Sequence, residues 1–271
     1  SEIPIRDKSG VFIGARMGRP EKAKMRKLTG SPHALFPVGE QGGRLRSFQS
    51  AFEKGFIRSD FPLYKCHKCE KETIFSVCEN CDKKTSKLYY CKICGLLDKN
   101  ECTKHGKIGA FKPQDIDIKI YFENFMKKLN LNSFPDLIKG VRGTSNKDHT
   151  PEHLIKGILR AKSDIYVNKD GTTRYDMTQL PITHFKPKEI NVSPEKLREM
   201  GYVEDIHGKE LQNNDQVLEI KPQDIILPSC DESPELGADK ILYNIGLFID
   251  DLLVRFYGLD SFYNFKSEED V

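Results

Sequence analysis

The chain has 271 residues, 38% of them hydrophobic, and a formal net charge of +3. This length exceeds that of a usual single domain while the apolar content supports only a modest core, so we expect two or three small units. The sequence contains no run of about 18 apolar residues, and its first ten residues lack the apolar core of a secretion signal. These features argue against membrane insertion and predict a cytoplasmic protein.

The charge is distributed unevenly along the chain. Residues 1–58 contain 12 Lys and Arg against 5 Asp and Glu, which gives +7. Residues 59–112 contain 11 against 7, which gives +4, and residues 113–271 contain 20 against 28, which gives −8. Such asymmetry indicates that the first half of the chain binds anions.

The stretch "GARMGRPEKAKMRKL" at 14–28 has a single acid and is the most cationic part of the chain. Proline in the first turn and Gly30 after the end predict a helix over 20–29. A solvated cationic helix is one interpretation. Phosphate binding is the other, favoured by the flanking glycines and by a second basic, glycine-rich loop, "GEQGGRLR". The cations of the two stretches are Arg16, Arg19, Lys22, Lys24, Arg26, Lys27, Arg44 and Arg46.

The next predicted elements are a loop over 31–45 and a short helix in "RLRSFQSAFEKG". A cysteine-rich region follows, with the pattern C-x-x-C, eight residues, C-x-x-C, and then C-x-x-C, seven residues, C-x-x-H. Paired ligands at this spacing let two tight turns close a tetrahedron around one zinc ion, so we predict two structural zinc sites with no open coordination position. The predicted ligands are Cys66, Cys69, Cys78 and Cys81 for one ion and Cys91, Cys94, Cys102 and His105 for the other.

Three alternatives to this ligand assignment remain open. Disulfides are disfavoured by the periodic pairing in a cytoplasmic chain, and an iron–sulfur cluster is disfavoured by the histidine in the second set. The pair Cys66 and Cys69 could share an ion with Cys91 and Cys94 in a cross-braced arrangement; we favour sequential pairing. His67 lies inside a turn and is predicted to be exposed, and Cys230 is predicted to be an inert thiol.

The rest of the chain alternates between helical and extended patterns. Amphipathic helices are predicted in "IKIYFENFMKKLNL" and "TPEHLIKGILRAK", on either side of a glycine-rich link, "KGVRGTSNK". Residues 164–228 alternate with period two around turn residues, which predicts a small β unit with a tight turn at "NKDGT". The last forty residues predict one long helix that stops at Gly258.

The sequence shows no set of residues typical of catalysis within the chain itself. Alternation with isoleucine places Asp115 and Asp117 on one solvated face, and the adjacent Asp250 and Asp251 point about 100° apart on a helix. No nucleophile turn, phosphate loop or H-E-x-x-H motif occurs. The remaining histidines are interpreted as structural or exposed: His33, His149, His153, His184 and His207. The residues alone therefore predict a zinc-stabilised protein that binds nucleic acid or nucleotide phosphates.

Longer runs carry a resemblance to a known family. "IGARMGRPEKAKMRKL", "HALFPVGEQGG", "KGILRAKSDIYVNKDGTTRYDMTQLPITHFKP", "KPQDIILP" and "FIDDLLVRFYGLDSFYN" resemble an internal portion of the large subunit of the archaeal D-family DNA polymerase. The resemblance implies an α+β, multi-unit fold: part of a double-psi β-barrel polymerase core with zinc-ribbon-like modules and flanking helices. It also implies DNA replication by metal-dependent nucleotidyl transfer.

The resemblance assigns roles to the cations. Lys22 and Lys24 match the basic motif of the family's catalytic centre and are expected to stabilise phosphate charge. The other cations of the two basic stretches are expected to contact nucleic acid: Arg16, Arg19, Arg26, Lys27, Arg44 and Arg46. The family's aspartate motif, which holds magnesium, lies downstream of "FYGL" and is absent from these 271 residues. We therefore expect this chain alone to be inactive as a polymerase.

The resemblance also suggests a division of the chain and a set of partners. The expected partners are primer-template DNA, deoxynucleotide triphosphates, the remainder of the large subunit, an exonuclease-bearing small subunit and a sliding clamp. The expected regions are a basic active-site segment (1–58), a double zinc-binding module (59–112), a helical linker (113–163), a small β unit of the barrel core (164–234) and a C-terminal helix (235–271).

Two other functions are compatible with parts of the pattern. A stand-alone zinc adaptor could bind DNA or a replication protein without catalysis. An RNA-polymerase-like transcription subunit would share barrels and zinc ribbons, but the long matched runs do not favour it.

Overall fold

A computed structural model describes residues 31–131, 133–173, 183–222, 224, 226 and 237–271. These residues form two compact units, one containing 31–173 with Tyr243–Val271 and the other running from 183 to Leu242. The stretch 14–28, with its six cations and the helix predicted over 20–29, lies outside the described residues, as does Cys230. None of the helices in the described part of the chain combines the length and apolarity needed to cross a bilayer.

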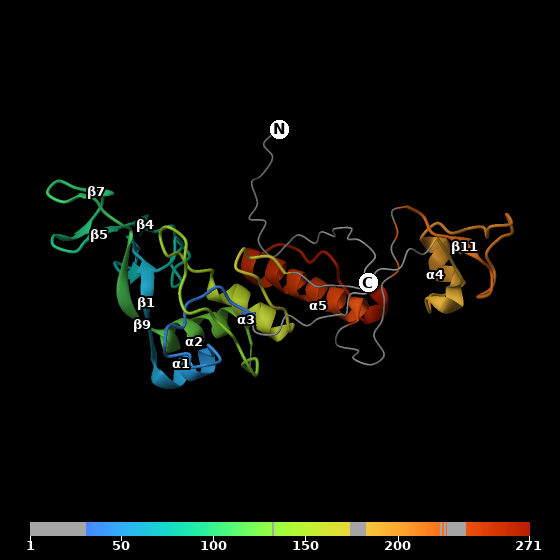
Figure 1. The fold of residues 1–271 in the computed structure, drawn as a ribbon, viewed down its shortest axis with the longest axis horizontal. Helices are drawn as coiled ribbons and strands as arrows, with labels where there is room; N and C mark the ends of the chain where they lie inside the picture. The colour runs from blue at the N-terminus through green and yellow to red at the C-terminus, as the bar shows by residue number, and fades with distance from the viewer. Residues whose placement is uncertain (1–30, 132, 174–182, 223, 225, 227–236) are drawn as a thin grey trace. The chain divides into compact units, whose positions relative to one another are not determined.

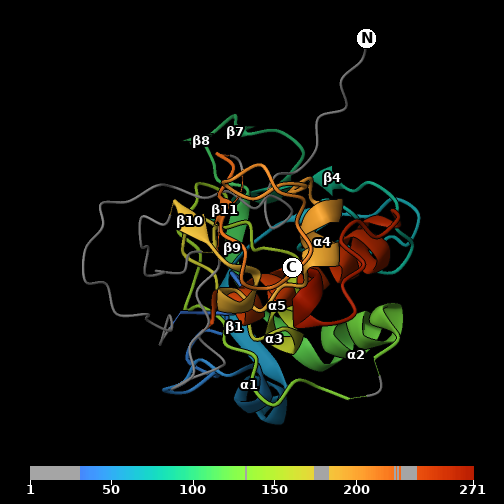
Figure 2. The same cartoon turned by 90° about the vertical axis from the view of Figure 1, so that its right-hand side faces the viewer.

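The first unit is organised around a long antiparallel ladder. Strand β1 (Phe56–Pro62) pairs with β9 (Phe111–Asp117) over their full length, with Phe56 opposite Asp117 and Pro62 opposite Phe111. Both views place helices α1 (Phe48–Lys54) and α2 (Ile118–Leu129) at one end of the ladder and small strands at the other (Figures 1 and 2). The 48 residues between the two strands therefore form an excursion from the ladder.

The excursion contains only short strands. They form one three-stranded sheet in the order β3-β2-β4 and two two-stranded sheets, β5-β6 and β7-β8. Their bounds are β2 Tyr64–Lys65, β3 Glu72–Thr73, β4 Ser86–Lys87, β5 Tyr89–Cys91, β6 Gly95–Leu97, β7 Glu101–Cys102 and β8 Gly106–Lys107.

The helices of the first unit begin and end at side chains suited to those positions. The Ser47 hydroxyl accepts a hydrogen bond from the Ser50 amide at the start of α1, and Gly55 ends α1 in the left-handed conformation with φ 86°. Asp117 ends β9 and caps α2 by accepting from the Lys119 and Ile120 amides. The short helix predicted in "RLRSFQSAFEKG" is confirmed as α1, and the two predicted amphipathic helices are confirmed as α2 and α3 (Leu154–Lys162).

One hydrophobic core joins the ladder, these helices and the C-terminal helix. Helix α3 is buried nearly all round, since every residue from Leu154 to Arg160 is buried. The largest fully buried apolar side chains of this core are Phe36, Phe48, Phe61, Phe125, Ile57, Ile118, Leu129, Ile138, Leu154 and Ile158.

The long C-terminal helix is confirmed. Helix α5 (Ala238–Asp251) continues as a π-helical stretch, Leu252–Tyr257, and ends at Gly258, which has φ 64°. From Tyr243 onward this helix belongs to the first unit, and a final 3₁₀ turn covers Glu268–Asp270. Gly258 stops the helix because a residue without Cβ adopts the left-handed conformation at no steric cost.

The second unit has less regular structure than the alternating pattern predicted. Its described residues contain two strands of two residues each, β10 (His184–Phe185) and β11 (Leu218–Glu219), which pair antiparallel. They also contain a 3₁₀ turn, Pro187–Glu189, and helix α4 (Pro194–Glu199). No closed barrel occurs in the described ranges. A small separate core holds this unit together: Phe185, Leu197, Tyr202, Leu211 and Leu218.

The predicted tight turn in "NKDGT" forms, and no strand precedes it in the described residues. The Asn168 amide donates to the Thr172 carbonyl at 2.8 Å, and Gly171 has φ 81°. Residues 164–173 contain no strand. The turn residues were thus predicted correctly, whereas the period-two pattern overestimated the strand content before the turn.

Candidate metal centres

Four tight turns within the excursion share one backbone design. In the first set, the Cys66 amide donates to the Lys71 carbonyl and the Cys78 amide donates to the Lys83 carbonyl, each at 2.9 Å. In all four turns the residue directly after the second predicted ligand has positive φ: Glu70 at 54°, Asp82 at 55°, Gly95 at 87° and Gly106 at 73°. This reversal of the chain turns both ligand side chains of a pair toward the same point.

The first set brings four thiols together. Its Sγ atoms all lie within 4.8 Å of one another, with Cys66 and Cys81 at 3.5 Å and Cys69 and Cys78 at 4.0 Å. Thiolates bound at about 2.3 Å to a tetrahedral zinc ion lie about 3.8 Å apart. The four sulfur atoms thus fit one zinc ion.

The second set brings three thiols and one imidazole together. The His105 Nδ1 atom lies 3.4 Å from the Sγ atoms of Cys91, Cys94 and Cys102, and the last two sulfurs are 3.7 Å apart. A tetrahedral zinc ion with one nitrogen ligand places nitrogen and sulfur about 3.6 Å apart. The second set therefore also fits one zinc ion, with Nδ1 of His105 as the fourth ligand atom.

The alternatives to sequential zinc sites fit the geometry less well. A disulfide requires sulfur atoms about 2.05 Å apart, far closer than any pair in either set, and all seven of these cysteines are free. The cross-braced arrangement needs Cys66 and Cys69 beside Cys91 and Cys94, whereas the structure groups each pair with the next pair along the chain. A multinuclear iron–sulfur cluster requires thiolates separated by several atoms, and these are nearly in contact.

Backbone amides around each set favour the thiolate form, which is the form that binds metal. The Cys69 amide, which donates to Cys66 Sγ, lowers the pKa of Cys66 to about 7. The Lys104 amide, followed by the His105 side chain, lowers the pKa of Cys102 to about 6. The Cys102 thiol in turn raises the pKa of His105. Other thiols are shifted in the opposite direction: burial raises the pKa of Cys78, and the Cys102 thiol raises the pKa of Cys94 to about 11.

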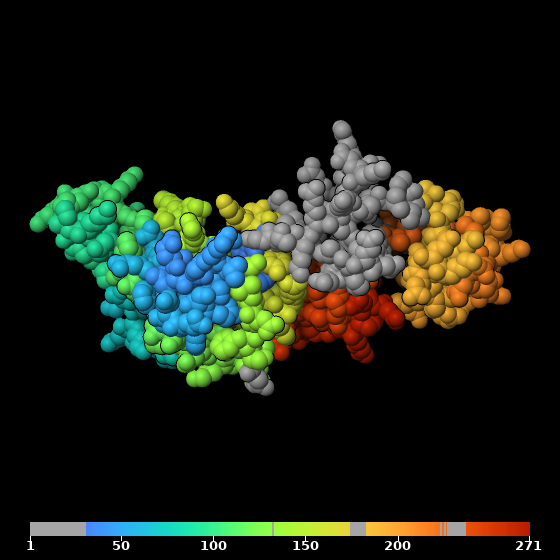
Figure 3. All heavy atoms as spheres, turned by 60° about the horizontal axis from the view of Figure 1, so that its bottom comes forward, coloured from blue at the N-terminus to red at the C-terminus, as the bar shows by residue number. Residues whose placement is uncertain are grey.

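The two sets differ in burial. Cys66 and Cys78 are buried and their partners half-buried, and the spacer between the two pairs contributes Ile74 and Phe75 to the main core. In the second set Cys94 and His105 are exposed. Figure 3 shows the residues around the second set, in green at one end of the view, as a lobe of the first unit.

The remaining sequence-predicted residues have the following positions. His67 is exposed, as predicted, and its Nε2 atom lies 2.6 Å from the Ser86 hydroxyl. Arg44 is exposed on the loop before α1, and Arg46 is half-buried with φ 56°. The cations of the 14–28 stretch lie outside the described residues, so Arg44 and Arg46 are the predicted phosphate contacts that the structure locates.

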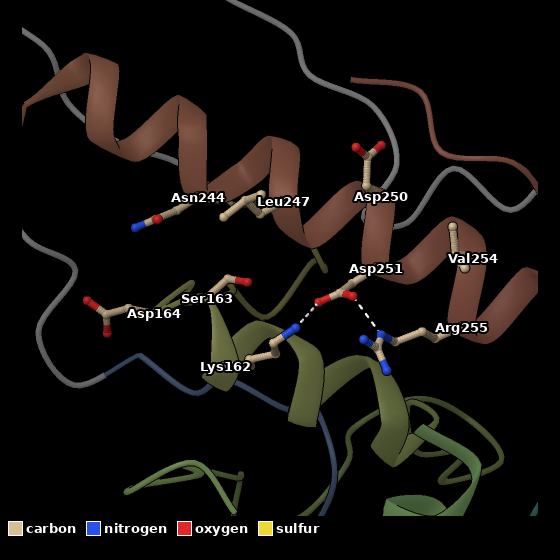
Figure 4. A pocket seen from close by; sticks show the side chains of 9 residues that line it. All are labelled: Lys162, Ser163, Asp164, Asn244, Leu247, Asp250, Asp251, Val254 and Arg255. Atoms are coloured by element: carbon tan, nitrogen blue, oxygen red, sulfur yellow. Dashed lines mark hydrogen bonds and ion pairs between the residues drawn. The ribbon is translucent and has the colours of Figure 1, made fainter. Parts of the chain in front are cut away.

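The paired carboxylates have structural partners. Asp115 is exposed on β9 opposite Arg58 at 3.6 Å. Asp250 accepts backbone amides at 262–264, whereas Asp251 pairs with Lys162 at 2.5 Å and with Arg255 at 2.7 Å. Figure 4 shows the two carboxylates pointing apart, as the helical spacing predicted.

A cavity of about 540 Å³ lies between the end of α3 and α5 (Figure 4). Its charged lining residues are Lys162, Asp164, Asp250, Asp251 and Arg255, of which Asp251 forms ion pairs with Lys162 and Arg255. Within the described ranges, the only groups of side chains that could hold a metal ion are the two cysteine-containing sets. The cavity therefore offers no divalent cation site comparable to those sets.

Sequence reasoning missed a buried ion pair. The Arg160 side chain is 1% exposed, and its guanidinium makes two hydrogen bonds to the Glu152 carboxylate, at 2.5 and 2.7 Å. The presence of two cations, Lys156 and Arg160, in the mostly apolar stretch "LIKGILR" was the available signal. The spacing of charged residues in the sequence did not identify Glu152 as the partner of Arg160.

Comparison with known proteins places this chain in a family. Residues 131–271 match the family described as "DNA polymerase II large subunit DP2, catalytic domain", and residues 1–100 match "DNA polymerase II large subunit DP2, central domain". The first match covers more than half of the chain. The chain belongs to the DNA polymerase II large subunit family.

Relatives named "DNA polymerase II large subunit" match the chain over its full length. The relative from Nanoarchaeum equitans is 43% identical over 308 aligned positions, covering 100% of this chain and 25% of the relative. The one from Archaeoglobus fulgidus is 45% identical over 281 positions, covering 100% and 24%. The one from Thermococcus kodakarensis is 42% identical over 281 positions, covering 100% and 15%. The chain thus spans a quarter or less of the length of these family members.

The two family matches leave part of the excursion between them. The central-domain match ends at residue 100 and the catalytic-domain match begins at 131. Cys91 and Cys94 fall inside the first match, whereas Cys102 and His105 fall in the interval. The second ligand set is therefore defined by the geometry of this chain rather than by either match.

Proposed function

We propose that this chain is a portion of the large subunit of a DNA-directed DNA polymerase that acts in DNA replication. The observation that carries the proposal is the match, over the full length of the chain, to proteins named "DNA polymerase II large subunit" at 42–45% identity. Within that subunit, this portion supplies cationic residues for phosphate and a metal-stabilised scaffold for nucleotidyl transfer.

The scaffold contains two structural zinc ions. The Cys₄ and Cys₃His donor sets, the tetrahedral spacing of their ligand atoms and the absence of an open position support zinc in both. When bound, zinc links turns whose strands are too short to be stable alone. Neither ion takes part in the chemistry.

The phosphate-contacting residues are Lys22 and Lys24 at the reacting phosphates, with the neighbouring arginines, Lys27, Arg44 and Arg46 along the nucleic acid. Fixed cations stabilise the negative charge that a phosphoryl transition state spreads over its oxygens. Magnesium ions are held by carboxylates outside these 271 residues, and the segments at 1–58 and 164–234 contribute to a double-psi barrel core. The partners are primer-template DNA, deoxynucleotide triphosphates, the rest of the large subunit, an exonuclease-bearing small subunit and a sliding clamp.

Primer extension tests the assignment of roles. The chain combined with the polypeptide that follows it in its relatives should extend a primer, and the chain alone should not. Lys22→Ala and Lys24→Ala should each reduce extension strongly while the zinc content stays at about two ions per chain. Normal extension by both variants would refute the role of these lysines.

Metal analysis tests the scaffold separately. Purified chain should contain zinc in a ratio of about two per chain without visible absorption. Iron with visible absorption, or one ion per chain, would show that at least one ligand set is assigned to the wrong metal or does not bind.

A further inference from the structure

The segment Pro32–Val38 connects the two groups of cations to which a phosphate role is assigned. The cations of residues 14–28 precede it, and Arg44 and Arg46 follow it. The segment has no regular secondary structure beyond one isolated bridge, at Pro37, yet His33, Ala34, Phe36 and Val38 are buried. Its path must therefore be fixed by contacts with other parts of the chain.

Glu152 and Arg160 hold the middle of this segment. The Leu35 amide donates to Glu152 Oε2 at 3.1 Å, and the Glu152 amide donates back to the Leu35 carbonyl at 3.0 Å. One Arg160 nitrogen donates to the His33 carbonyl at 3.0 Å while the guanidinium also binds the Glu152 carboxylate. The ion pair thus contacts the backbone on both sides of Ala34.

Two glycines allow the close approach. A Cβ atom on Gly157 of α3 would lie 2.2 Å from the Ala34 Cβ, so α3 can contact the segment only without a side chain at this position. A Cβ atom on Gly140 would lie 2.7 Å from the Phe36 carbonyl oxygen. The Gly140 amide also donates to the Arg46 carbonyl at 2.9 Å, and the Val141 amide donates to the Phe36 carbonyl at 3.1 Å. This short stretch joins the segment to the loop that carries Arg46.

We propose that Glu152, Arg160 and Gly157 are positioning residues that set the path of Pro32–Val38 and thereby the placement of the two arginines that follow it, Arg44 and Arg46, against phosphates. The proposal rests on the phosphate role assigned to those cations above. A buried guanidinium bound to a carboxylate and to a backbone carbonyl is geometrically restrictive, because its planar donors accept few arrangements. Such an ion pair restricts both the distance and the relative orientation of the groups that it joins.

The test measures binding of the 271-residue chain to primer-template DNA by fluorescence anisotropy over a range of salt concentrations. Gly157→Ala and Glu152→Gln should each weaken binding about tenfold and reduce the slope of log affinity against log salt by about 0.9 for each phosphate that is no longer neutralised. The double variant Ala34→Gly/Gly157→Ala should recover part of the affinity and slope, because it removes the nearest atom, the Ala34 Cβ at 2.2 Å, and leaves only the Ala34 Cα at 2.9 Å in close approach.

Phe125→Leu serves as the control for stability. Phe125 is fully buried, and its ring neighbours are Phe75, Tyr121 and His153 rather than the segment. This variant should lower the thermal stability yet retain the wild-type affinity and salt slope of the folded fraction.

The outcomes separate this proposal from the function on which it rests. If Arg44→Ala/Arg46→Ala leaves affinity and slope unchanged, the phosphate role of these two arginines is wrong. If that variant weakens binding while Gly157→Ala and Glu152→Gln bind as wild type, the positioning role is wrong. A slope change in Phe125→Leu equal to that in Gly157→Ala would also overturn it, because loss of stability alone would then account for the effect.

Discussion

The two metal-ligand sets have nearly the same spacing but different surroundings. The eight-residue spacer of the first set contributes Ile74 and Phe75 to the main core, and its turn residue Asp82 pairs with Lys128 of α2 at 2.5 Å. The seven-residue spacer of the second set contains Leu96, which is 40% exposed, and Ile93 within its first turn is 77% exposed. Ligand spacing therefore brings the ligand atoms of each set together, whereas contact between the apolar residues of the spacer and the main core makes only the first set part of that core.

Removal of one buried ligand from each set gives the largest expected difference. Cys78→Ser and Cys102→Ser should each reduce the zinc content by about one ion per chain. Because structural zinc contributes folding free energy directly, Cys78→Ser should lower the free energy of unfolding of the first unit by about 5 kcal/mol or more. Cys102→Ser should increase hydrogen exchange at 88–110 and leave α2 and α3 protected.

Hydrogen exchange with zinc quantification distinguishes these results. Equal loss of protection in α2 and α3 for both variants would contradict the conclusion that only the first ligand set is part of the main core. Retention of two zinc ions by either variant would contradict its ligand assignment.

Truncation of the spacers tests the same comparison without changing a ligand. Phe75 packs against Phe36, Tyr121 and Phe125 with ring centroids 6.0 to 6.4 Å apart. Phe75→Ala should therefore cost about 3–5 kcal/mol of unfolding free energy. Leu96→Ala, its counterpart in the second spacer, should cost less than about 1 kcal/mol. Denaturant titration in excess zinc measures both, and similar costs would show that the second spacer is also part of the core.

The ligand sets could be predicted from the sequence because each pair lies within one turn. Their surroundings could not, since Ile74 and Phe75 resemble Leu96 and Leu97 until the core is known. The contacts between Glu152 and Leu35 also could not be predicted from the sequence, because the two residues are 117 positions apart along the chain.

In the second unit the sequence pattern predicted more strand than the described residues contain. Its turn-rich sequence alternates in polarity, yet its described strands are only two residues long. Alternation predicts strands only where a partner strand and a face to bury are available, and periodicity reports neither.

A change of pH tests the contact between the first spacer and α3. His153 caps α3, and its ring stacks on Phe75 at 4.6 Å. Burial, followed by the charges of Lys128 and Lys156, lowers the pKa of His153 to about 3. Below pH about 6.5 the unfolded chain binds a proton that the folded chain does not, so stability should fall with decreasing pH by up to about 1.4 kcal/mol per unit.

His153→Asn is the matched variant for the pH prediction. Asparagine retains a cap acceptor for the Ile155 amide but does not titrate. Protonation of the zinc ligands also destabilises the protein at low pH and affects both proteins alike. The difference in unfolding free energy between wild type and variant should therefore shrink as the pH falls from 7 to 5. A difference that is independent of pH would contradict the neutral, buried imidazole.

The smallest expected effect concerns the turn residues with positive φ, where the two sets differ again. The first set has Glu70 and Asp82 at these positions and the second has Gly95 and Gly106. A Cβ atom on Gly106 would meet nothing within 4 Å, so Gly106→Ala adds backbone strain without a clash and should cost about 1 kcal/mol. Glu70→Gly should relieve similar strain and stabilise the first set by up to about 1 kcal/mol, reduced by the entropy of the unfolded glycine.

Zinc release to a chelator measures these two effects site by site. Gly106→Ala should speed the release of one ion and Glu70→Gly should slow the release of the other. Asp82→Gly is not an equivalent test, because it also removes the ion pair with Lys128. If Gly106→Ala left the release rate unchanged, strain at this position would not limit coordination, and the shared backbone design would be a consequence of the turns rather than a requirement for metal binding.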